Sequence, residues 1–311
     1  MLDRLPAVIV HSILGFLEYS YSYDRCRTAN RLRMLSKDVA MLLQQYPCYK
    51  SRCLREVPPE RRSRCHVVTV TEPSPVLECV EELKVACSDG VGWLPERHPN
   101  LRFLAASKAT PLSHPLPEYI TQLDAELEAP EQLKVLVTTL PFTRLRWLQL
   151  SLEFEPNLAL EAAMLPDTLR TLVLYSFYVR VKSLPEGLRN LTLKALDFSI
   201  DSYPALVSCR MEVWAYQGAP LPNTLKRLKL VQMGEAEFPA APVGLQQLEI
   251  DVVRCPPAWW FPSSLRALDL WCRPWSSPSE GFVDEVREAC PNLTRFTLRG
   301  QAMITRQVLS Q

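Results

Sequence analysis

Glycine is scarce in this chain, and the short motifs of nucleotide-binding and hydrolytic enzymes are absent. Only 9 of its 311 residues are glycine, and neither Gly-Lys-Ser/Thr nor Gly-x-Gly-x-x-Gly occurs. Gly-x-Ser-x-Gly and His-Glu-x-x-His are also missing. The 4 histidines, His11, His66, His98 and His114, lie in unrelated contexts. These absences argue against an enzyme, so the sequence predicts no catalytic residue and no cofactor.

The cysteines lack the spacing of a metal site. None of the 10 cysteines belongs to a Cys-x-x-Cys pair, and none has a histidine at zinc spacing. Cys65 and His66 are adjacent, which is poor geometry for one closed site. We therefore expect no metal, and we expect reduced, buried thiols of the kind found in the cytosol or nucleus.

Long apolar runs are lacking too. No stretch reaches the roughly 18 apolar residues that a membrane helix needs. Residues 5–17 imitate the core of a signal peptide, but Pro6 and His11 interrupt them and no Ala-x-Ala pattern follows. The sequence thus predicts a protein without a membrane partner, located in the cytoplasm or nucleus.

Neither sign of charge dominates, because the net charge is only +1. Residues 1–64 hold 12 Lys/Arg and 6 Asp/Glu, a net of +6, which leaves −5 for the remainder. The stretch 50–64 is the most basic, and we interpret it as a solvated linker. A nuclear import signal or a phosphate contact are the alternatives. It has no interleaved aromatic residues, which argues against a nucleic-acid partner.

A short phrase is repeated in the middle of the chain. It reads LPDTLRTLVL at 165–174, LPEGLRNLTL at 184–193 and LPNTLKRLKL at 221–230, with degraded copies at 241–250 and 261–270. A period of about 20 residues is typical of a solenoid, which offers an extended binding face rather than a catalytic cleft.

The copies predict where the strands lie. In each Leu-x-x-Leu-x-Leu, the alternation makes a short strand with its leucines inward and the intervening residues outward. Weaker copies upstream and between the clear ones bring the total to roughly ten to twelve turns. Copies beginning at Leu133 and Leu145 are too close together, so one must leave the stack. The last interval is longer, and apolar residues at helical spacing predict one helix near 280–290. The clear copies begin at Leu101, Leu145, Leu169, Leu188, Leu225, Leu245, Leu265 and Leu293.

This pattern resembles the leucine-rich-repeat family over roughly residues 65–300. The resemblance implies an α/β solenoid shaped as a horseshoe, with a parallel sheet on the concave side and a mostly non-helical convex side. The family usually has Asn at the ninth position, counted from the first leucine of Leu-x-x-Leu-x-Leu. Here that position is Phe177, Leu196, Met233 and Val253, so we expect apolar packing to hold that turn. Trp259 and Trp260 are expected to fill the convex core.

Residues 1–49 depart from the repeat and predict a small α-helical module of two amphipathic helices. One interpretation is a cap for the solenoid. The other is a resemblance to the F-box, whose members bind a Skp-type adaptor of cullin–RING ubiquitin ligases. The resemblance implies a module at 1–49, a linker at 50–64 and a repeat domain at 65–311. Its adaptor-binding residues would be Leu5, Pro6, Ile9, Ile13, Leu14, Phe16 and Leu17.

The outward positions of the repeats are the main candidate site. They predict a face with exposed aromatic residues and a charge series that runs basic, acidic, basic. Aromatic residues and arginine dominate protein interfaces. We therefore expect a non-catalytic adaptor that holds a protein destined for ubiquitination, or a scaffold with no ligase role. The partner-binding residues would be Trp147, Tyr175, Lys194, Arg227, Lys229, Glu249, Asp251, Asp269, Trp271 and Arg295.

Overall fold

Most of the described chain lies downstream of residue 101. The structure is a computed structural model that describes residues 50–51, 67–70, 82–85, 101–108, 110, 112, 116–154, 159–214, 217–232, 234, 240–272, 281–300 and 303–308. The helical module expected at 1–49, with its adaptor-binding residues, lies outside the described residues, as does 52–64.

The chain divides into two compact units, Met1–Leu123 and Asp124–Gln311. In the first unit, Leu83, Val85 and Leu104 are buried, as the inward phase of the repeat predicts. Two residues of the basic stretch 50–64 form the first strand of this unit. The strands pair in parallel and in sequence order: β1 (Lys50–Ser51), β2 (Val67–Val70), β3 (Glu82–Val85) and β4 (Phe103–Ala106).

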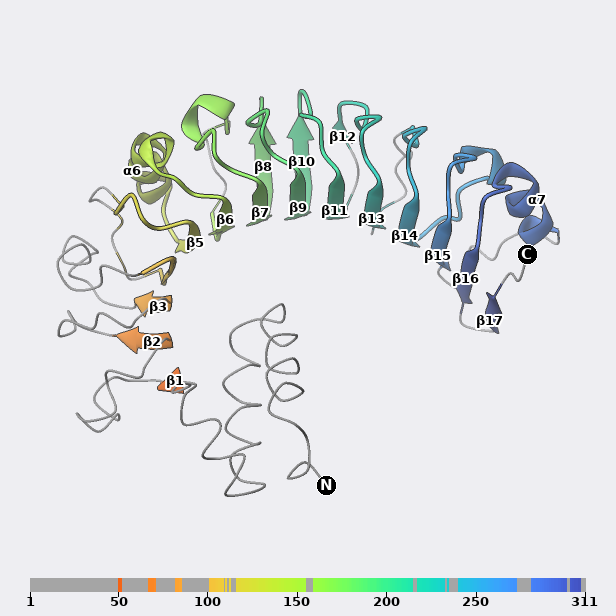
Figure 1. Ribbon diagram of the computed structural model, residues 1–311, viewed down its shortest axis with the longest axis horizontal. Helices are drawn as coiled ribbons and strands as arrows, with labels where there is room; N and C mark the ends of the chain where they lie inside the picture. The colour runs from red at the N-terminus through yellow and green to blue at the C-terminus, as the bar shows by residue number, and fades with distance from the viewer. Residues whose placement is uncertain are drawn as a thin grey trace, which may run out of the picture. The chain divides into compact units, whose positions relative to one another are not determined.

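The unit Asp124–Gln311 is a parallel β-solenoid of about 8 turns. Its strands lie side by side in one row, and the segments that connect them lie along one side of that row (Figure 1). Strand β17 (Met303–Val308) pairs antiparallel with the last parallel strand. After β5 (Gln122–Leu127) the row runs β6 (Trp147–Leu152), β7 (Thr171–Ser176), β9 (Asn190–Ala195), β11 (Ser208–Val213), β13 (Arg227–Gln232), β14 (Gln247–Val252), β15 (Ala267–Cys272) and β16 (Arg295–Gly300).

The Leu-Pro phrase forms a tight turn that leads into each strand. The Leu169 N–H donates to the Pro166 carbonyl at 3.0 Å, and Leu225 does the same to Pro222 at 3.0 Å. Proline can open this turn because only its carbonyl is needed there. The hydroxyl of Thr168 then donates to the Leu145 carbonyl of the preceding turn at 2.7 Å. The phrase therefore both ends one turn and ties it to its neighbour.

The leucines of the phrase form a continuous core, as predicted. Leu172 lies opposite Leu148 and Leu191 in register, and all three are buried. The weak copy between the clear ones is also correct, because Cys209 and Met211 are buried in β11. Successive turns thus share one row of apolar side chains, which is how a repeat too small to fold alone becomes stable.

The prediction of apolar packing at the ninth position was wrong for Phe177 and Leu196. Phe177 and Leu196 are exposed. Backbone hydrogen bonds hold the position instead: the Leu196 N–H donates to the Phe177 carbonyl at 3.0 Å, and the Trp214 N–H to the Leu196 carbonyl at 3.2 Å. The chain then enters a second parallel sheet of β8 (Tyr178–Val181), β10 (Asp197–Ile200) and β12 (Gln217–Gly218). Buried Val179 and Phe198 supply the apolar contacts from these strands.

In the described part of the repeat region, helices replace the usual connection at two places. Helix α7 (Phe282–Ala289) lies where the sequence predicts it, with Phe282 and Val286 buried. Helix α6 (Pro130–Thr139) was not predicted, but it resolves the crowding of two copies. Leu133 and Leu136 belong to α6, while Leu145 begins a regular strand turn. Short 3-10 turns also occur among the described residues, at Leu140–Phe142, Ala162–Met164 and Ala258–Trp260.

The two adjacent tryptophans have opposite surroundings. Trp260 is buried and its ring meets that of Phe261 edge-on, with ring centroids 5.5 Å apart. Trp259 is 81% exposed, so the prediction that it fills the convex core was wrong. Both lie in a single 3-10 turn, where neighbouring side chains point in different directions and only one can face inward.

The described cysteines match the expectation of free thiols. Cys209, Cys272 and Cys290 are buried, and Cys255 is partly exposed. Burial raises the pKa of the Cys209 thiol to about 12 and that of Cys290 to about 11. These thiols therefore pack as small apolar side chains and stay protonated at neutral pH.

Candidate functional site

The outward side chains of β6 through β16 form one surface, which we call the open face. Buried positions alternate with more exposed ones along most of these strands because successive side chains point to opposite sides of a sheet, and Val173 in β7 is the outward position that is also buried. Parallel pairing in register then places equivalent residues of successive turns in rows. Neighbouring residues in a row are about 4.8 Å apart.

The ten predicted face residues all lie in these rows, but they do not form one cluster. The row nearest the start of the strands contains Trp147, Arg227 and Arg295. The middle row contains Lys229, Glu249 and Asp269, and the row nearest the strand ends contains Tyr175, Lys194, Asp251 and Trp271.

Most charged residues in the middle row of the open face form ion pairs with residues on a neighbouring strand. Lys229 forms an ion pair with Glu249 in the next turn. Arg227 lies opposite Gln247 rather than an acid. Further along, Arg299 contacts Asp269 at 2.8 Å. Exposed pairs of this kind contribute little to stability, so this part of the face mainly compensates its own charge.

Two face residues of β11 were missed by sequence reasoning. Arg210 and Glu212 alternate with the buried Cys209 and Met211. Their alternation with buried residues is the sequence signal that marks Arg210 and Glu212 as outward-facing. Glu212 is the focus of a small network, because it accepts hydrogen bonds from Arg210 and is paired with Lys194 at 3.4 Å.

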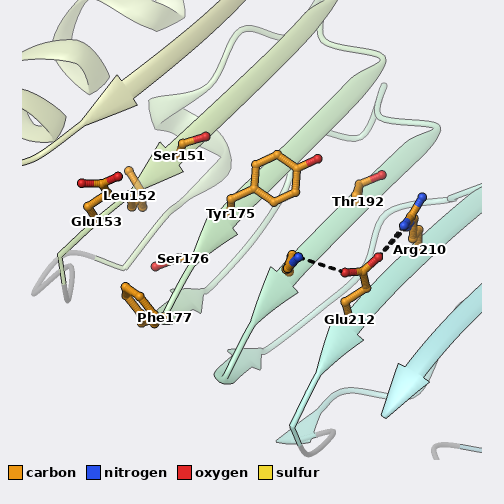
Figure 2. Close-up of a pocket in the computed structure, with 10 residues that line it drawn as sticks. Ser151, Leu152, Glu153, Tyr175, Ser176, Phe177, Thr192, Arg210 and Glu212 are labelled. Carbon is orange, nitrogen blue, oxygen red and sulfur yellow. Dashed lines mark hydrogen bonds and ion pairs between the residues drawn. The ribbon is translucent and has the colours of Figure 1, made fainter. Parts of the chain in front are cut away.

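The network borders a shallow depression of about 510 Å³ on the open face. Figure 2 shows Tyr175 on β7 between Ser151 and Thr192, with Phe177 just beyond the end of the same strand. Arg210 and Glu212 lie at one side of the depression and Glu153 at the other. Its lining consists of Ser151, Leu152, Glu153, Tyr175, Ser176, Phe177, Thr192, Lys194, Arg210 and Glu212.

The charged side chains at one side of the depression shift the pKa values of Glu212 and Arg210. Partial burial by itself would raise the pKa of Glu212, but the hydrogen bond from Arg210 and the charges of Arg210 and Lys194 outweigh it, so this pKa is lowered. The same hydrogen bond raises the pKa of Arg210. Glu212 is therefore ionised and Arg210 is charged at neutral pH, and two cations share one carboxylate.

A line of exposed apolar side chains follows the strand ends next to the depression. Phe177 is 54% exposed, Leu196 46% and Trp214 55%, and they occupy the ninth position in three successive turns. We call these three residues the apolar edge. Large exposed apolar side chains that lie together mark interaction sites more often than isolated ones do.

The open face carries polar, charged and aromatic groups. Among the described residues, no three His, Cys, Asp or Glu side chains are arranged to hold a metal ion. No helix in the described part of the chain is long and apolar enough to cross a membrane. The side chains of this face can form ion pairs, hydrogen bonds and apolar contacts.

Comparison with known proteins finds no match to this chain among family models, curated proteins or solved structures. The function must therefore be argued from the residues and geometry described above.

Proposed function

We propose that this chain is a protein-binding solenoid of the leucine-rich-repeat type and that its open face holds the partner. The supporting observation is the exposure of aromatic side chains on that face and its edge. Tyr175 and Trp271 are exposed on the face, and Phe177 and Trp214 are exposed at the strand ends. A fold does not need these positions to be aromatic, whereas protein interfaces are enriched in such side chains.

We further propose that the protein serves as the substrate-recognition subunit of a Skp–cullin–F-box ubiquitin ligase. The support is the resemblance of residues 1–49 to an F-box, through residues such as Leu5, Pro6 and Ile13. In this arrangement the N-terminal module would dock a Skp-type adaptor and the open face would hold the protein to be ubiquitinated. The role is one of binding and assigns no reaction to this chain.

The second candidate is a leucine-rich-repeat scaffold with no connection to ubiquitin. The residues of 1–49 also suit a cap, because the apolar end of a solenoid must be covered. Both candidates use the open face in the same way. They differ only in whether the N-terminal module has a partner of its own.

Deletion of residues 1–64 separates the two candidates. Full-length protein and the deletion variant would be captured from cells, and the associated proteins identified by mass spectrometry. The ligase role requires that a Skp-type adaptor be recovered with the full chain and lost with the deletion. Equal recovery by both chains, or recovery by neither, would rule it out.

A triple variant tests the open face itself: Trp147→Ala, Tyr175→Ala and Trp271→Ala. The matched control is Trp259→Ala, which removes an exposed indole from a connecting segment rather than from the face. We expect the triple variant to lose captured proteins other than the adaptor, while Trp259→Ala retains them. Equal capture by the triple variant and the control would show that the partner uses another surface.

A further inference from the structure

The depression on the open face carries more positive than negative charge at its β9–β11 side. Lys194 and Arg210 both pair with Glu212, and no second carboxylate lines that side. The side chains of Lys194 and Arg210 are 59% and 51% exposed, whereas that of Glu212 is 17% exposed. The two cations therefore keep donors available to solvent, while the carboxylate between them is covered.

An apolar surface lies beside these cations. Lys194 is in register with Tyr175 on the adjacent strand, about 4.8 Å away. Tyr175 and Phe177 both line the depression, and both are exposed. Tyr175 lies on β7 and Phe177 directly follows the end of that strand, so both aromatic side chains border the depression near the same strand end.

We infer that this depression recognises an acidic side chain, a carboxylate or a phosphate, flanked by an apolar residue in an extended segment of the partner. The acidic group would bind the solvent-exposed donors of Lys194 and Arg210 that Glu212 leaves available, and the apolar residue would pack on Tyr175 and Phe177. Charge complementarity supports this occupant, because bringing in one anion balances the excess cation. The inference rests on the proposed protein-binding role of the open face and specifies what that face recognises.

The far side of the depression limits how the segment can lie. Glu153 follows β6, which is two strands from β9 in the sheet order, or about 10 Å. Its carboxylate would repel a second acidic residue there. An extended chain covers about 10 Å in three residues. We therefore expect that the partner segment has no second acidic residue three positions away from the bound one in the direction of Glu153.

Short labelled peptides provide the probe. Nonapeptides with a central Glu between two Leu residues in a Gly/Ser background would be titrated with the full-length protein and followed by fluorescence anisotropy. Parallel peptides carry phosphoserine, Gln or Lys at the centre. We expect the Glu or the phosphoserine peptide to bind about tenfold more tightly than the Gln peptide, and the Lys peptide to bind most weakly. The comparison of Glu with phosphoserine identifies which anion is preferred.

Variants of the network should change affinity in opposite directions. Lys194→Gln and Arg210→Gln should each weaken binding of the anionic peptide about three- to tenfold, because each removes one cation. Glu212→Gln should strengthen it by a similar factor, because the two cations no longer share a carboxylate. Arg180→Gln is the matched control, since this exposed residue lies on β8, away from the open face and outside the depression. It should leave the affinity unchanged.

Two results would overturn the inference. One is the absence of any preference for Glu or phosphoserine over Gln. The other is an unchanged or weakened affinity in Glu212→Gln together with unchanged affinity in Lys194→Gln and Arg210→Gln. Thermal unfolding of each variant shows whether it folds. If Lys194→Gln or Arg210→Gln does not fold, the direction in which Glu212→Gln changes the affinity for the anionic peptide still tests the inference.

The same data separate this inference from the proposed function. If the aromatic triple variant loses captured proteins but the peptides show no preference for an anion, only the acidic specificity is wrong. If the triple variant and the Trp259→Ala control capture the same proteins, the open face is not the binding surface.

Discussion

Replacing Leu172 with alanine removes a side chain that three successive turns share. Leu172 is fully buried in β7, between Leu148 and Leu191 on the neighbouring strands. The change deletes three carbon groups, which are worth about 2.4 kcal/mol at about 0.8 kcal/mol for each. A cavity that both neighbouring turns line adds to this cost, so we expect a loss of about 3–4 kcal/mol in the free energy of unfolding.

Thr171→Ala is the control for this change. Thr171 precedes Leu172 in β7 but points to the open face, where its hydroxyl oxygen accepts a hydrogen bond from the Asn190 amide at 3.2 Å. Losing one partly exposed hydrogen bond should cost about 0.5–1 kcal/mol. The two substitutions therefore differ mainly in which side of the sheet they affect.

The measurement is urea unfolding followed by circular dichroism, with the midpoint and the slope fitted for each variant. A lower midpoint at constant slope reports lost stability, whereas a changed slope would show that the turns no longer unfold together. Equal losses in Leu172→Ala and Thr171→Ala would refute the assignment of inward and outward positions. A larger loss in Thr171→Ala would reverse it.

Cys209 should make stability fall at high pH, because burial raises the pKa of its thiol from 9.0 to about 12 in the folded chain. Its contribution is complete below about pH 9 and is lost as the pH rises toward 12, at about 1.4 kcal/mol for each pH unit, since only the unfolded chain releases the proton. Cys209→Ala should lack this part of the pH dependence in urea titrations, and an identical slope in both proteins would contradict the burial of the thiol. Gly234→Ala should lower the thermal midpoint by an amount equivalent to about 1–3 kcal/mol, because its Cβ would lie 2.7 Å from the Trp214 carbonyl oxygen and 2.8 Å from the indole nitrogen. An unchanged midpoint would show that the turn after β13 can relax around the added methyl group.

Much of the fold could be predicted from the phrase alone. The spacing of leucines located the parallel strands of the main row from β3 to β16 and assigned their inward residues, including the degraded copy with Cys209 and Met211. It also located α7 through its helical spacing. These features depend on local periodicity, which a single sequence contains in full. The spacing did not predict the second sheet of β8, β10 and β12.

The errors arose where neighbouring turns decide the outcome. The apolar residues Phe177 and Leu196 suggested a packed spine, yet backbone hydrogen bonds between adjacent turns hold that position and leave both side chains exposed. Trp259 and Trp260 look equivalent in the sequence, but only one of them can face the core. Apolar character alone does not reveal which surface a side chain meets.

The candidate site shows the same division. The alternating pattern predicts that polar and aromatic side chains such as Tyr175 and Lys194 point to one face, because strand periodicity is a property of the local backbone. The pattern does not predict that Lys194 and Arg210 share Glu212 beside Tyr175, which becomes visible only in the folded chain. That arrangement depends on the register between turns about 20 residues apart. Register is set by the shared core and the inter-turn hydrogen bonds, and neither is a property of a single repeat.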